Sequence, residues 1–231
     1  MARMLKSDVT VPIVKEPYYI IANDRLIGSQ CDDSRVKVLS KAGAGVLEVG
    51  ELAINHIHTL PPNKVPLLLL SAGSEDISEE HANIEISTVR GDTDKVRDEL
   101  VDTVIKNIVS VGKKVRELGG KMIVTSLIPR PREQSPEVGI NRHKPEIQEI
   151  LSDAYVAINN RIYRYNKNTG ESFPNIKSAL EKTGRQGAVY EGRDQSKIVY
   201  NKFLRDLVHI KNSTRVKMMR TCVRHLIHIR Y

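Results

Sequence analysis

Short apolar runs of strand length alternate along this chain with longer segments of helical periodicity. Residues 65–70 are apolar throughout and bounded by turn residues, which is typical of a strand buried on both faces of a sheet. Comparable strand-length runs occur at 18–21, 36–39 and 121–127. Segments 46–57 and 92–118 repeat apolar residues at helical spacing. This alternation favours right-handed crossovers and a parallel sheet with helices on both faces.

The C-terminal segments complete the predicted fold. We expect a helix over 145–158, with proline at its first position, and a fifth, more exposed strand over 161–165. A final helix runs from Ser213 to about Ile229. The predicted class is α/β, a flavodoxin-like three-layer α/β/α sandwich with a five-stranded parallel sheet. Residues 1–16 are predicted to be an N-terminal arm, and residues 17–231 a single domain that ends in a basic helix.

Length and composition narrow the class of protein. The 231 residues fit one α/β domain with a sizeable core, and two small domains are the alternative. The two cysteines, Cys31 and Cys222, give neither a disulfide framework nor a metal cluster, which favours an intracellular setting, cytoplasmic or nuclear. No stretch reaches the ~18 apolar residues of a membrane span. We therefore expect no membrane span, no metal and no cofactor.

Basic residues are unevenly distributed. Lys and Arg number 36 against 28 Asp and Glu, a net charge of +8. The last segment, 213–231, contains no acid; its basic residues are Arg215, Lys217, Arg220, Arg224 and Arg230, with His225 and His228. A second group comprises Arg130, Arg132, Arg142, His143 and Lys144. These groups are either a solvated helix face and a loop, or a patch that faces a polyanion such as nucleic acid.

Candidate site residues fall where the predicted strands end. In open parallel sheets, sites form at the carboxyl ends of the strands. Asp206 and His209 come from the loop before the last helix, and an Asp three residues before a His can orient the imidazole for acid-base catalysis. The spacing alone is weak, because such pairs also occur by chance. The predicted strand ends fall at 23–25, 42–43, 73–76 and 126–129.

The order and spacing of these segments resemble the SGNH (GDSL-type) hydrolase family over about residues 18–226. They are most similar to the small esterase-like domains of some retrotransposon-encoded proteins. In that family the first strand ends in Gly-Asp-Ser, whose Ser is the nucleophile; the matching residues here are Asn23-Asp24-Arg25. The family's oxyanion-hole glycine matches Gly43, with Gly45 as the alternative.

Two further blocks of the family have counterparts in this chain. The Gly-x-Asn-Asp block falls on residues 73–76, where Glu75 stands in place of the oxyanion-hole Asn. The Asp-x-x-His block is retained as Asp206 and His209. Residues 126–131 resemble the strand-end segment of the retroelement domains. The resemblance therefore implies an SGNH hydrolase-like fold with two altered chemical positions.

Both alterations oppose acyl transfer by the family's mechanism. The Arg25 guanidinium stays protonated and cannot accept an acyl group. The Glu75 carboxylate would repel the negative charge that an oxyanion hole must stabilise. Asp206 and His209 are then a relic pair. Arg25 and Glu75 either close the old pocket as an ion pair or remain exposed charges that never meet.

Three functions follow from this interpretation. The first is a catalytically inactive pseudo-esterase domain that binds a protein partner, self-assembles, or binds nucleic acid in a mobile-element or viral context. Its nucleic-acid contacts would be Arg215, Lys217, Arg220 and Arg224. The second is an active esterase or deacetylase that combines His209 and Asp206 with a non-aligned serine, namely Ser29, Ser71 or Ser74. The third is a structural or coat role.

Overall fold

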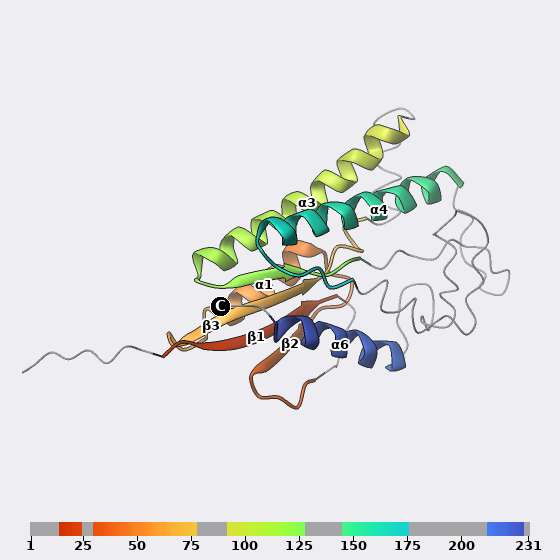
Figure 1. The fold of residues 1–231 in the computed structure, drawn as a ribbon. Coiled ribbons are helices and arrows are strands. Elements are labelled where there is room, and N and C mark those ends of the chain that lie inside the picture. The colour runs from red at the N-terminus through yellow and green to blue at the C-terminus, as the bar shows by residue number, and fades with distance from the viewer. Residues whose placement is uncertain (1–13, 25–29, 78–91, 128–144, 176–211, 229–231) are drawn as a thin grey trace, which may run out of the picture.

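The computed structural model describes residues 14–24, 30–77, 92–127, 145–175 and 212–228 (Figure 1). Their strands form one parallel sheet in the order β2-β1-β3-β4. The strands are β1 (Glu16–Asn23), β2 (Val36–Ser40), β3 (Lys64–Ser71) and β4 (Lys121–Val124). The helices are α1 (Val46–Ile57), α3 (Thr93–Glu117), α4 (Pro145–Asn168) and α6 (Asn212–Leu226).

The two faces of the sheet carry separate apolar clusters. Alternate strand residues point to opposite faces, so Ile20 and Leu68 pack with α1, α3 and α4, while Ile21 and Leu69 pack with α6. Figure 1 shows α6 alone on its side of the sheet among the described helices. This arrangement confirms the predicted three-layer α/β/α sandwich. None of the described helices combines the length and apolar character needed to cross a membrane.

The predicted strand over 161–165 is wrong, because these residues belong to α4. Ile158, Ile162 and Tyr165 recur at spacings of four and three, which places them on one side of a helix. Both isoleucines are fully buried and Tyr165 is half-buried, whereas Tyr163, which directly follows Ile162, is exposed. The local run of β-branched and aromatic residues suggested a strand, but the apolar stripe of α4 continues through it to Asn168.

Two asparagines of α4 form hydrogen bonds with the backbone of β4 and of the residues that follow it. Their side-chain amides thereby pair with N–H and carbonyl groups that a further strand could have paired. The Asn166 Oδ1 accepts the N–H of Val124 at 3.0 Å, and its Nδ2 donates to the Val124 carbonyl at 2.7 Å. Asn159 holds Leu127 in the same way, at 2.7 and 3.1 Å. Asn159 and Asn166 are seven helical residues apart, and Leu127 and Val124 are three extended residues apart. Both spacings correspond to roughly 10 Å, so the two asparagines are spaced to match their backbone partners. The described sheet therefore has four strands.

Candidate functional site

The carboxyl ends of the four strands lie at one edge of the sheet. Asn23 at the end of β1 is level with Ser40 of β2 and Ser71 of β3, and Leu70 is level with Val124 of β4. The segments that follow each strand therefore leave the sheet together. We call this the carboxyl edge.

Polar side chains are buried along this edge. Thr125 Oγ1 donates to Ser71 Oγ at 3.0 Å, and Ser74 is only 3% exposed. Buried polar groups are costly unless hydrogen-bonded, so such a layer is a structured feature and not an extension of the apolar core. Its members are Asn23, Asp24, Ser71, Ser74, Thr125 and Ser126.

Gly43 and Gly45, the two candidate oxyanion-hole glycines, occupy different environments. Gly45 precedes α1, its N–H donates to Glu48 Oε2 at 3.3 Å, and a Cβ there would lie 2.9 Å from the Asp76 carboxylate. Gly43 has a φ of +65°, with no atom within 4 Å of the position a Cβ would take. Among the described residues, its N–H has no hydrogen-bond acceptor. Gly43 is therefore the more available donor at the carboxyl edge.

Asp76 fixes the loop that carries Ser74 and Glu75. Its Oδ2 accepts the N–H of Val46, at the start of α1, at 2.8 Å, and its Oδ1 accepts from Asn107 Nδ2 of α3 at 3.3 Å. The N–H of Val46 is thus bonded to Asp76, and the N–H of Gly45 to Glu48. A phosphate bound at the start of α1 would need these same donors. The Gly43-Ala44-Gly45 turn is therefore poorly suited to cradle a phosphate. Asp76 is the last residue of the segment that resembles the Gly-x-Asn-Asp block, and the motif alone gives no sign of its contacts with α1 and α3.

Asp76→Ala is expected to lower the free energy of unfolding by about 1–3 kcal/mol, because it removes a helix cap and a charge-assisted contact to a second helix. Urea denaturation followed by circular dichroism measures this. Asp92→Ala is the matched control, since Asp92 caps α3 through the N–H of Lys95 alone and is exposed. An Asp76 variant no less stable than the Asp92 variant would contradict a role in joining the two helices.

The remaining predicted site residues are only partly placed. Glu75 is half-buried in the loop after β3, next to Asp76. Gly73 in the same loop has a φ of +129°, and a Cβ there would lie 3.3 Å from the Leu127 side chain, so glycine is required. Arg25, Asp206 and His209 lie outside the described residues. The Arg25–Glu75 ion pair therefore stays a prediction.

The basic residues of the last helix are placed on α6. Arg220 and Arg224 are exposed, whereas nothing is described of the Arg215 and Lys217 side chains. Cys222, on the buried side of α6, has its thiol pKa raised to about 12 by burial, which makes it unreactive at neutral pH. Within the described ranges, no group of three or more His, Cys, Asp or Glu side chains is arranged to hold a metal ion.

Solved structures of lipolytic hydrolases share this fold. Phospholipase A1 from Streptomyces albidoflavus NA297 has 12% identity and a TM-score of 0.56, covering 92% of this chain and 100% of that one. An extracellular lipase from Streptomyces rimosus has 12% identity and a TM-score of 0.55, covering 91% and 100%. A GDSL-like lipase from Bacteroides thetaiotaomicron VPI-5482 has 16% identity and a TM-score of 0.51, covering 90% and 85%.

The chain therefore has the SGNH (GDSL-type) hydrolase-like fold that its motif spacing predicted. No family model and no curated protein matches the sequence. Identities of this size show the fold alone, because one fold hosts many unrelated functions. The similarity to retrotransposon-encoded domains stays a prediction.

Proposed function

We propose that this chain is a catalytically inactive SGNH hydrolase-like domain that acts as a binding or assembly module. The observation that carries the proposal is Glu75, a half-buried carboxylate in the loop after β3, where the family resemblance expects a neutral amide donor. Acyl transfer develops negative charge on the carbonyl oxygen, and a fixed carboxylate at that place raises the barrier. Arg25 at the aligned nucleophile position adds to this, since a guanidinium forms no acyl intermediate.

The serines described at the carboxyl edge give less support to the alternative, an active esterase or deacetylase. Ser74 is 3% exposed, and Ser71 is 9% exposed with its Oγ accepting a hydrogen bond from Thr125. A nucleophilic oxygen must reach the acyl carbon of a bound substrate, and both serines are enclosed by protein. Ser29 lies outside the described residues.

The purified chain is expected to hydrolyse p-nitrophenyl acetate no faster than its His209→Ala variant and to form no adduct with a fluorophosphonate probe. The reason is that neither an activated serine nor an unopposed oxyanion hole is expected at the site. Intact-protein mass spectrometry measures the adduct. Labelling that disappears in both Ser74→Ala and His209→Ala would instead establish the esterase alternative.

The partner of this module is proposed to be nucleic acid, bound through α6. Arg220 and Arg224 on this helix are exposed, and the helix contains no acid. Phosphate groups attract such a surface without sequence readout. A protein partner or self-assembly is the second candidate.

A further inference from the structure

The basic residues of α6 and of the last turns of α4 differ from most other cations in the described part of the chain. Lys41, for example, pairs with Glu48 at 2.5 Å, and Arg161 pairs with Asp102. In contrast, no described carboxylate lies within ion-pair distance of Arg164, Lys167, Arg220 or Arg224. No acid occurs in α6, nor in α4 after Asp153. Within the part of the chain that the structure describes, these four cations therefore have no acidic partner.

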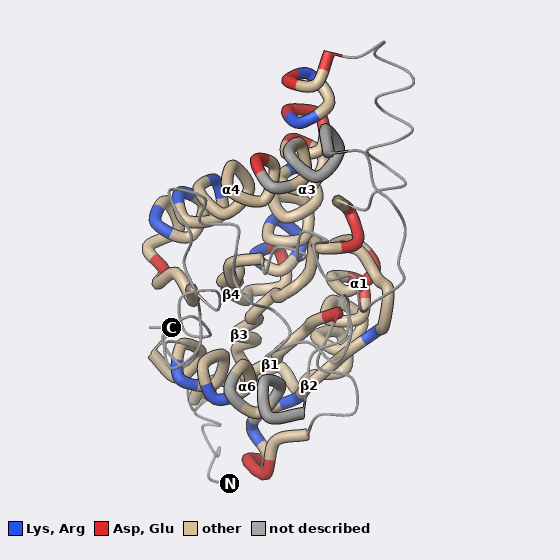
Figure 2. The backbone as a smooth tube through the Cα atoms, turned by 90° about the vertical axis from the view of Figure 1, so that its right-hand side faces the viewer, with Lys and Arg blue, Asp and Glu red and all other residues tan. Residues whose placement is uncertain are grey.

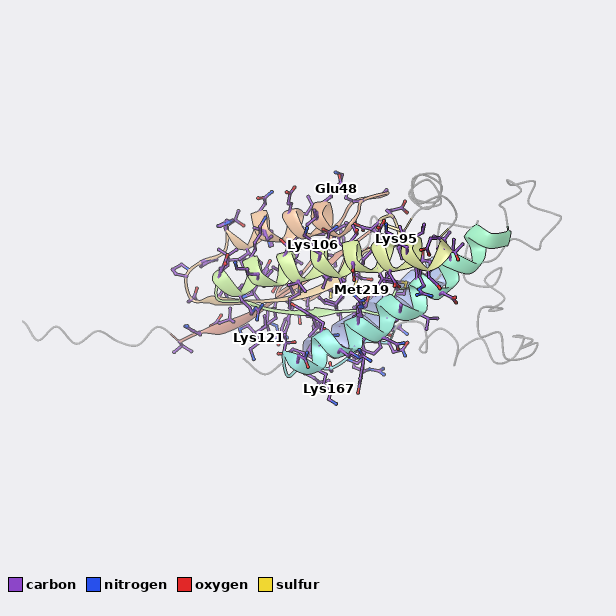
Figure 3. All side chains as sticks on the ribbon, turned by 90° about the horizontal axis from the view of Figure 1, so that it is seen from above. Glu48, Lys95, Lys106, Lys121, Lys167 and Met219 are labelled. Carbon is purple, nitrogen blue, oxygen red and sulfur yellow. The ribbon has the colours of Figure 1, made fainter. Side chains whose placement is uncertain are left out.

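Contacts between distant parts of the sequence bring the two basic groups to one surface. Ser172 Oγ lies 3.2 Å from His225 Nδ1, so the segment that leaves α4 rests against α6. In Figure 2 the blue segments of α6 and of this end of α4 both lie toward the left of the view, with the sheet between the two helices. Figure 3 shows Lys167 and Lys121 on the α4 side, away from Glu48. Glu171 between the helices is largely buried and pairs with Lys121 at 3.7 Å, which reduces its opposing charge.

An exposed aromatic ring belongs to the same surface. Tyr163 is 49% exposed and precedes Lys167 by one helical turn, so the two side chains share a face of α4. The Phe173 ring packs edge-on against it, with the ring centroids 5.7 Å apart and the planes at 83°. Phe173 directly follows Ser172, which touches α6. The segment after α4 therefore supports the Tyr163 ring through Phe173 and contacts α6 through Ser172.

The positive charges of α6 also act on its own histidine. The pKa of His225 is lowered by burial first, and then by the nearby His228 and Arg224. Repulsion between neighbouring cations disfavours the protonated imidazole. The lesser causes show that His228 and Arg224 lie close enough to His225 to act on it.

We propose that this α4–α6 surface, defined by Tyr163, Arg164, Lys167, Arg220 and Arg224, binds single-stranded nucleic acid. The four cations contact phosphates, and Tyr163 stacks on a base. The proposal deepens the binding role proposed above and rests on it. A single strand fits because its base faces are open to an aromatic ring, which a duplex does not offer.

An anionic membrane fits this surface less well. Membrane-surface helices insert an apolar face beneath the lipid headgroups. The apolar residues Met218, Cys222 and Leu226 of α6 are instead buried against the sheet. Val216 of α6 and Ile227 just after it are exposed, but the exposed Arg220 and Arg224 lie between them and interrupt any apolar stripe. Phosphate and base contacts therefore suit the outward part of α6 better than lipid insertion.

The test is fluorescence anisotropy of the full chain with a labelled oligothymidylate of about 20 nucleotides, long enough to span several stacked bases. Arg220→Gln with Arg224→Gln should raise the Kd and reduce the slope of log Kd against log salt by about 1.4, because each lost single-strand phosphate contact contributes about 0.7. Tyr163→Ala should raise the Kd by about 5-fold to about 100-fold, and Tyr163→Phe should restore it. Circular dichroism checks that each variant is folded.

Lys95→Gln with Lys113→Gln is the matched control, since it removes the same charge from α3, where these lysines lie near Glu99 and Glu117. This control should leave the Kd within about 2-fold, because each of these lysines already has a carboxylate of α3 beside it. Equal effects of the two double variants, or no effect of Tyr163→Ala, would overturn the proposal. So would tight binding to phosphatidylserine vesicles without binding to the oligonucleotide. Ester hydrolysis is measured separately. Turnover that depends on His209 would refute the proposal that the domain is inactive. Failure to bind the oligonucleotide, without such turnover, would refute only the proposal that the α4–α6 surface binds nucleic acid.

Discussion

Asn166→Ala is expected to lower the free energy of unfolding by about 2–5 kcal/mol, the largest loss from any single substitution considered for this chain. Asn166 is fully buried, and its amide both donates to and accepts from the backbone of Val124. Alanine would leave the N–H and the carbonyl of Val124 without these partners inside the protein. A buried polar group left unsatisfied loses its hydration without compensation, and here two are affected.

Urea denaturation of the wild type and variants measures this loss. Asn168→Ala is the control on the same helix, because Asn168 is exposed; its effect should stay below about 0.5 kcal/mol. Asn166→Asp keeps the acceptor but removes the donor, and it introduces a carboxyl group into a buried site, so it should destabilise at least as much. A loss below about 1 kcal/mol in Asn166→Ala would show that the contact with β4 is not needed.

The second large expected effect is a gain of esterase activity in a double variant. If the scaffold at the carboxyl edge is intact, Arg25→Ser combined with Glu75→Asn should create covalent labelling by a fluorophosphonate and measurable hydrolysis of p-nitrophenyl acetate. The serine restores a nucleophile for His209 to activate, and the asparagine restores a donor for the oxyanion. The loop that carries position 75 is already held by the contacts of Asp76 with Val46 and Asn107.

The single variants separate the two contributions. Arg25→Ser with Glu75 retained should react about 100-fold more slowly than the double variant, since an oxyanion-hole donor is worth about that factor. Adding His209→Ala to the double variant should abolish both readouts. A folded double variant that remains unlabelled would show that Arg25 and Glu75 are not what separates this chain from a hydrolase.

Much of the fold could be predicted because it is encoded locally. The helix predicted over 46–57 is α1, and the apolar run 65–70 lies within β3. Continuous apolar runs and helical stripes are properties of short windows, so each element could be recognised without knowing its neighbours. The wrong strand over 161–165 is the instructive exception. Its local residue types favoured a strand, and packing of Ile158 and Ile162 against the core decided for a helix.

The site could be predicted only in part. The order of blocks placed Gly43 and Glu75 at the carboxyl ends of two strands, and the register of the strands puts both loops at the carboxyl edge. The sequence did not reveal that Asp76 caps α1, because that contact spans 30 residues. Nor did it show that Gly45 is enclosed by the same carboxylate while Gly43 stays open. The difference between the two glycines depends on which backbone N–H already donates a hydrogen bond within the protein, and this is decided by tertiary contacts.

The sequence by itself determined the alternation of strands and helices and the basic character of the last helix, and it has Arg25 and Glu75 at the two positions where the family resemblance expects a nucleophile and an oxyanion donor. These are matters of residue type and period. Only the tertiary structure decided that α4 side chains hold β4, and that the segment after α4 contacts Tyr163 through Phe173 and α6 through Ser172. Contacts between segments tens of residues apart depend on how the layers pack, and no local pattern records that packing.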